Sequence, residues 1–199
     1  MAANNSSGTD AQMTIYAICA SGQYVYPHKT VSVAPGHTNA AKVSRPAGTK
    51  VVGGGVVGIG GDHSVEVGSS EPADGHDANH KIDDAWFGVA NNGTNASIHM
   101  EVDAVCAKHG QYTVIAGPRT ALPNNAIATS AVACPHGTRV TGGGTDVTGG
   151  TTDSEVHDGF PIDGSDADTI RDDGWQSTAY NDNSGSLQHM KTFAICKTV

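Results

Sequence analysis

Residues 161–167 read Pro-Ile-Asp-Gly-Ser-Asp-Ala and are followed, at 172–175, by Asp-Asp-Gly-Trp. The same arrangement stands earlier in the chain, where 72–78 read Pro-Ala-Asp-Gly-His-Asp-Ala and 83–86 read Asp-Asp-Ala-Trp. Both parts of the later copy lie 89 residues after the earlier one, as 161 − 72 and 175 − 86 show. A constant offset over two separate motifs indicates an internal duplication.

The duplication extends to a glycine-rich segment in each half. Residues 45–55 read Arg-Pro-Ala-Gly-Thr-Lys-Val-Val-Gly-Gly-Gly, and residues 134–144 read Cys-Pro-His-Gly-Thr-Arg-Val-Thr-Gly-Gly-Gly. Proline fixes φ and glycine permits positive φ, so each segment predicts a turn that leads into a strand. The three glycines predict a bulge or a close crossing of strands. A phosphate-cradling loop would need a following helix and a Lys-Ser/Thr pair, which neither copy has.

Short, alternating segments rich in β-branched residues predict an all-β protein. Three of them end in Ala-x-Cys, at 13–19, 102–106 and 192–196, and delimit two units of about five strands each. We expect two pseudo-symmetric repeats that form a β-sandwich or a β-prism.

The expected division of the chain is a disordered tail at 1–12, a first repeat at 13–101 and a second repeat at 102–199. Neither repeat has much aromatic mass, which favours one fused domain. Trp86 and Trp175 are the expected core anchors.

Composition limits the classes of partner. The 199 residues include 26 glycines, only 5% are aromatic, and 11 basic against 20 acidic residues give a net charge of −9. This balance disfavours nucleic acid and anionic membranes as partners, and suits cations or neutral polar ligands. No apolar run approaches the length of a membrane span.

The repeated carboxylates predict a calcium site in each repeat. Calcium takes six to eight oxygen ligands, often from an Asp-rich loop with glycine at its turn. The candidate ligands are Asp74, Asp77, Asp83 and Asp84 in the first repeat, and Asp163, Asp166, Asp172 and Asp173 in the second.

Two other interpretations of the acidic loops stay open. Asp-Gly is a common turn, so the carboxylates can serve only to bind loop amides. His76 and His80 give the first loop the look of a transition-metal site, but the second copy has Ser165 and Thr169 there.

The sequence favours binding over catalysis. It has no Gly-x-Ser-x-Gly and no His-Glu-x-x-His motif. The main prediction is a secreted, non-enzymatic module that binds carbohydrate or a surface polymer, with Trp86 and Trp175 as candidate ligand-binding residues. The alternatives are a carboxylate-dependent glycoside hydrolase, and a structural or inhibitor protein without a small-molecule site.

The motifs of the second repeat, from Cys-Pro-x-Gly-Thr-basic-Val to Ala-Ile-Cys, resemble a group of exported actinobacterial repeat proteins. The resemblance covers most of residues 13–199, and it does not point to any particular activity. The expected layout of sheets is also similar to the three-fold β-prism of the vitelline outer-layer protein.

Four cysteines in a Gly-rich, acidic chain predict two disulfides and an oxidising compartment. The resemblance implies a Cys134–Cys196 bond, which leaves Cys19 to pair with Cys106. The first repeat departs from the family pattern at Arg45, where the cysteine is missing. The competing connectivity is Cys106–Cys134 with Cys19–Cys196.

Overall fold

The computed structural model describes residues 9–10, 12–60, 64–75, 81–148, 154–164, 168–182 and 186–199, and none of these residues lies in a helix. The strands of the first half are β1 (Tyr24–Val25), β2 (His28–Val33), β3 (His37–Ser44), β4 (Lys50–Ile59), β5 (Val65–Ala73), β6 (Ala85–Asn92) and β7 (Ile98–Ala107). Those of the second half are β8 (Tyr112–Ala116), β9 (Thr120–Leu122), β10 (Ala126–Ala133), β11 (Thr138–Thr148), β12 (Ser154–Ile162), β13 (Gly174–Asn181) and β14 (Gln188–Thr198). The protein is therefore all-β, as the sequence predicts. Most of the predicted tail at 1–12 lies outside the described residues.

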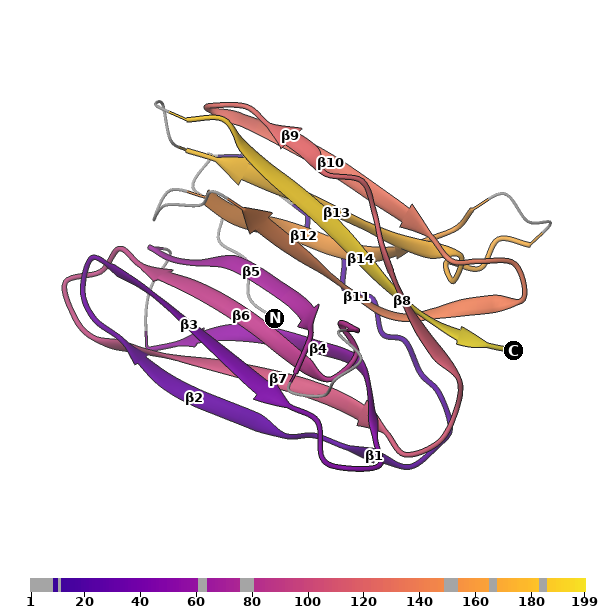
Figure 1. Cartoon of the computed structure of the whole chain (residues 1–199). Helices are drawn as coiled ribbons and strands as arrows, with labels where there is room; N and C mark the ends of the chain where they lie inside the picture. Colours follow the sequence, from indigo (N-terminus) through magenta and orange to yellow (C-terminus); the bar gives the residue numbers. More distant parts are fainter. Residues whose placement is uncertain are drawn as a thin grey trace.

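The two halves use the same set of antiparallel pairings. In the first half β7 pairs with β1, β2 and β4, while β6 pairs with β3 and β5. In the second half β14 pairs with β8, β9 and β11, while β13 pairs with β10 and β12. The halves lie against each other (Figure 1), and a bridge between Ser70 of β5 and Thr145 of β11 joins β3, β5 and β6 with β8, β9, β11 and β14 into one seven-stranded sheet. The four strands β1, β2, β4 and β7 form a second sheet, and β10, β12 and β13 form a third.

Each half has its core between its two groups of strands. In β7 alternate residues are buried, from Ile98 to Cys106, because one face of the strand points at the β3–β6 layer. The second core gathers Leu122, Val147, Ala179 and Met190 at one end, and Val132, Val140 and Ala194 at the other. This separation into two faces is what alternation along an antiparallel sheet produces.

A shared boundary fuses the halves. Ile195 of β14 packs into the first core, not the second. The Thr141 hydroxyl donates to the carbonyls of Val52 and Ile195, at 3.3 and 3.1 Å. Thr141 and Val52 occupy matching places in the two copies, so the halves meet through equivalent residues.

Each glycine triplet follows a bulge and lies where the chain is closely packed, as the sequence predicts. The register of β4 shifts between Val51 and Gly53, and that of β11 shifts between Val140 and Gly142. A Cβ at Gly54 would lie 2.3 Å from the Trp86 ring, and a Cβ at Gly143 would lie 2.2 Å from the Trp175 ring. The middle glycine therefore makes room for the tryptophan of its own repeat.

Three expectations about strands are corrected. Residues 13–19 form no strand, and Ile15 is 61% exposed, because the segment has no partner strand to complete its hydrogen bonds. Its Tyr16 instead stacks on Phe160, with ring centroids 5.9 Å apart. Each half has seven described strands, not five. The division between 101 and 102 falls inside β7, so the strand pairings move it to the end of that strand.

Candidate functional site

Each half has a corner where its Pro-x-Gly-Thr-basic turn meets its Asp-Asp pair. We call residues 45–50 with Asp83 and Asp84 the first corner, and residues 134–139 with Asp172 and Asp173 the second corner. Gly48 and Gly137 both have φ of +77°. The following threonine donates its hydroxyl to the proline carbonyl at 2.7 Å in both turns. The sequence therefore builds the same turn twice.

The backbone of each acid pair anchors the turn. At the first corner the carbonyls of Asp83 and Asp84 accept the N–H groups of Val51 and Arg45, at 3.3 and 2.8 Å. At the second corner Asp172 and Asp173 accept those of Val140 and Cys134, at 2.6 and 2.7 Å. These hydrogen bonds hold the backbone of each acid pair independently of the contacts that its side chains make.

The side chains of the acid pairs are also engaged. Lys50 Nζ lies 3.2 Å from Asp83 Oδ2, and Arg139 Nε lies 3.1 Å from Asp172 Oδ2. Asp84 is buried, and its Oδ1 accepts from Arg45 Nε at 2.5 Å.

Asp173 has no basic partner of this kind in the described structure, and its Oδ2 instead accepts the Gly164 N–H at 2.8 Å. Three of the four acids therefore hold ion pairs within their own corner.

The remaining predicted calcium ligands are placed only in part. Asp74 is partly buried and its carbonyl accepts from Lys42 Nζ at 3.0 Å, while Asp163 is exposed. Asp77 and Asp166 lie outside the described residues, as do His76 and His80. Among the residues that are described, no three histidines, cysteines or carboxylates gather in a group that could hold a metal ion.

Both tryptophans pack into or against the hydrophobic cores. Trp86 has 0% exposure, and its Nε1 donates to the Ser70 hydroxyl at 3.1 Å. A ring without exposed surface cannot stack on a ligand, so the prediction of Trp86 as a ligand-binding residue is wrong. Trp175 is partly buried and packs against the second core.

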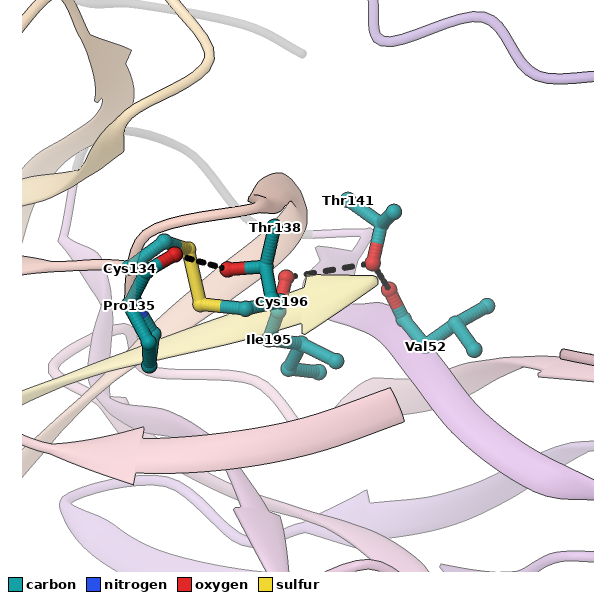
Figure 2. The surroundings of a disulfide bond; sticks show 7 residues. All are labelled: Val52, Cys134, Pro135, Thr138, Thr141, Ile195 and Cys196. Atoms are coloured by element: carbon teal, nitrogen blue, oxygen red, sulfur yellow. Dashed lines mark hydrogen bonds between the residues drawn. A yellow bond between two sulfur atoms is a disulfide. The ribbon is translucent and has the colours of Figure 1, made fainter. Parts of the chain in front are cut away.

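One predicted disulfide is confirmed. Cys134 and Cys196 are bonded, with Cα atoms 5.7 Å apart, and the bond ties the second corner to β14 (Figure 2). Pro135 and Thr138 form the adjacent turn, with their hydrogen bond beside the sulfur atoms.

The second predicted disulfide is wrong in both connectivities. Cys19 and Cys106 are free thiols, because Cys19 is exposed in the N-terminal segment and Cys106 is buried inside β7. Cys106 pairs with Val51 as Cys196 pairs with Val140, so it is the counterpart of Cys196. Arg45 occupies the place of its missing partner. Burial raises the pKa of the Cys106 thiol, against the opposing effects of Thr49 and Arg45.

The first corner opens into a shallow pocket of about 490 Å³. Its lining combines the turn with the connection that follows β7: Arg45, Gly48, Thr49, Lys50, Ala107, Lys108, His109 and Gly110. The pocket is not predicted from the sequence, because an overall charge of −9 hides a local group of basic residues. The signal was Arg45 in a cysteine position, together with Lys108-His109 directly after Cys106-Ala107.

A second missed feature lies where the halves join. Glu71 of β5 is partly buried, and desolvation together with the charge of Asp146 on β11 raises its pKa to about 8. Desolvation also raises the pKa of Asp146, while Lys191 on β14 acts in the opposite direction. No sequence pattern indicates this group, because it forms only when β5 meets β11.

Comparison with protein-family models, with curated proteins and with solved structures finds no match to this chain. In the described parts of the chain there is also no helix with the length and apolar character that crossing a membrane requires.

Proposed function

We propose that this protein is a secreted, non-enzymatic binding module built from two pseudo-symmetric β-sandwich repeats, and that its ligand is a carbohydrate or a surface polymer. The observation that carries the proposal is the open pocket at the first corner. At the matching place in the second repeat, the Cys134–Cys196 bond stands where the first corner has Arg45 and a free Cys106. A duplicated fold in which one corner is crosslinked and the other has basic side chains suits a binding site on a rigid support.

The disulfide supports the proposed location, because such bonds persist in oxidising compartments. The corner carboxylates support a binding role over chemistry, since Asp83, Asp84 and Asp172 are held in ion pairs. A general acid or base needs a side chain that is free to exchange a proton with its substrate.

Co-sedimentation with insoluble polysaccharides and cell-wall fragments tests the proposal. We expect depletion of the protein from solution without release of new reducing ends. A protein that stays in solution with every polymer tested would contradict the proposed function.

A glycoside hydrolase is a second candidate, favoured by the raised pKa of Glu71 beside Asp146. Glycoside hydrolysis uses a pair of carboxyl groups, one of which protonates the leaving group. The reducing-end assay decides this point. Product release that disappears in Glu71→Gln would favour the hydrolase over the binding module.

Calcium binding at the acidic loops is a further candidate function. It is favoured by one buried carboxylate oxygen that lacks a hydrogen bond in the described structure. Oδ2 of Asp84 is buried and accepts no hydrogen bond within the described part of the chain. A calcium ion there would compete with Arg45 for the same carboxylate. Calorimetric titration tests this candidate, with Asp74→Asn and Asp163→Asn expected to weaken one site each. Absence of heat and a melting temperature that ignores chelator would leave the loops as turns.

A further inference from the structure

The pocket at the first corner concentrates positive charge on an acidic protein. Three of the 11 Lys and Arg residues of the chain line it, together with a histidine. Basic residues that converge on one concave surface create a local potential opposite to that of the whole molecule. Such a pocket selects for negative groups, even though the net charge disfavours large polyanions in general.

Two of the basic side chains in the pocket are already compensated and two are not. Arg45 and Lys50 hold ion pairs with Asp84 and Asp83. In the part of the chain that the structure describes, Lys108 and His109 hold no ion pair. Both are exposed at the rim. The pocket therefore combines two ion-paired basic side chains with an exposed Lys108 and His109 that hold no ion pair in the described structure.

The rim is held in place by its backbone. The Lys108 N–H donates to the Gln23 carbonyl at 3.1 Å, and Gly110 has φ of +117°, a conformation that favours glycine. Gly48 also lines the pocket, and apart from its chain neighbours no atom lies within 4 Å of the position of a Cβ there. The pocket is thus shaped by two glycine turns before any ligand arrives, which lowers the ordering cost of binding.

The matching place in the second repeat has the same backbone connection but other side chains. The Thr198 N–H donates to the Gln111 carbonyl as the Lys108 N–H donates to the Gln23 carbonyl, and the Val199 N–H donates to the Gly137 carbonyl at 3.1 Å. Cys134 stands where the first corner has Arg45. The second corner therefore lacks one of the basic residues of the first corner, and it serves as an internal control.

We propose that the first-corner pocket binds an oxyanion, either a sulfate ester or a phosphate group, carried by an acidic surface polymer. The inference rests on the proposed function and names the chemical class of its ligand. Lys108 and His109 donate charge-assisted hydrogen bonds to the anion, and Lys50, paired with Asp83, adds a second lysine ammonium group to the lining. Arg45 acts indirectly, because it is ion-paired with Asp84.

Binding of three soluble probes tests the inference: dextran sulfate, polyphosphate and uncharged dextran. The test variant is Lys108→Gln with His109→Gln. The matched control is Lys197→Gln with His136→Gln, which makes the same replacements beside the second turn. We expect the test variant to bind the charged probes about tenfold more weakly, since it loses two charge-assisted hydrogen bonds. We expect the control variant to match the native protein, and dextran to bind to neither. A stronger response to dextran sulfate assigns a sulfate ester, and a stronger response to polyphosphate assigns a phosphate group.

Two outcomes overturn the inference. Equal weakening in the test and control variants would mean that only overall charge matters. Undiminished binding of the charged probes to the test variant, with an unchanged melting temperature, would place their site elsewhere. The result is separable from the proposed function. Polymer binding that survives in the test variant keeps the function and removes this site. Pocket-dependent binding of polyphosphate without binding to any polysaccharide or cell-wall fragment keeps the site and removes the function.

Discussion

The first and second corners share their backbone conformation but differ in the side chains at the cysteine position. Both have the positive-φ glycine, the threonine-to-proline hydrogen bond and the acid pair that accepts two N–H groups. In the second corner a disulfide connects the turn to the last strand, whereas the first corner has an Arg45–Asp84 ion pair and a buried thiol. The difference shows that the turn is held by its backbone, so the side chain at the cysteine position can be exchanged for another use.

Removal of the disulfide should have the largest effect on stability. Cys134→Ser with Cys196→Ser should lower the free energy of unfolding by about 2–5 kcal/mol, the usual range for native disulfides of small domains. Denaturant unfolding measures the loss. Cys106→Ser is the matched control in the first corner and breaks no crosslink. If both changes cost the same, packing at the strand end stabilises the corner, and the crosslink does not.

Arg45→Cys should convert the first corner into a copy of the second. The new cysteine would stand opposite Cys106 as Cys134 stands opposite Cys196, so we expect a disulfide between residues 45 and 106. Oxidation of this variant should stabilise it by about 2–4 kcal/mol relative to its reduced form. Thiol titration in denaturant without reductant checks the bond: one reactive thiol, that of Cys19, is expected. A count of three would show that the two corners differ in geometry as well as chemistry.

The repeated motifs allowed much of the corners to be predicted, but not their purpose. Lys50 and Arg139 recur at the same offset as Asp83 and Asp172, so their ion pairs could have been inferred from the duplication alone. The spacing of the acids instead predicts calcium ligands, because spacing does not show which side chains point at one another. The even number of cysteines predicts a second disulfide, although Arg45 marks the position of the missing partner.

Features that depend on contacts between distant strands could not be predicted. Residues 13–19 have strand-like alternation, yet alternation does not supply a partner strand. Glu71 meets Asp146 only because β5 borders β11. Tertiary context decides both cases, and a single sequence contains no direct record of it.

The middle glycines test whether the two cores are built alike. Gly54→Ala and Gly143→Ala should each lower the free energy of unfolding by about 1–3 kcal/mol, because the new Cβ overlaps a tryptophan ring. Gly55→Ala is the control, since no atom lies within 4 Å of its Cβ position. Thermal melts of the three variants give the comparison. A loss confined to Gly54→Ala would show that the partly buried Trp175 can move aside and Trp86 cannot.

The junction between the halves should make stability depend on pH. The pKa of Glu71 is raised to about 8 in the folded protein, so the native state binds an extra proton between about pH 4.5 and 8. Its contribution to stability is therefore present at low pH and is lost as the pH rises through this window, by on the order of 1–3 kcal/mol. Glu71→Gln should remove this part of the pH dependence, as seen in denaturant unfolding at pH 5 and pH 8.5. Parallel curves for the native protein and the variant would contradict the assignment.

The smallest expected effect concerns the two tryptophan N–H groups. Trp86 Nε1 donates to the Ser70 hydroxyl, but the matching residue for Trp175 is Gly159, and its Nε1 is buried without a hydrogen bond in the described structure. A Cβ at Gly159 would lie 3.0 Å from that nitrogen, which asks for a shift of a few tenths of an ångström. Gly159→Ser should therefore raise the free energy of unfolding by about 0.5–1.5 kcal/mol, the usual net value of one hydrogen bond. Gly159→Ala adds the Cβ without the hydroxyl, so the difference between the two variants isolates the hydrogen bond from the backbone effect. If serine is no more stable than alanine, Trp175 Nε1 gains no acceptor, and the second half does not follow the first in this detail.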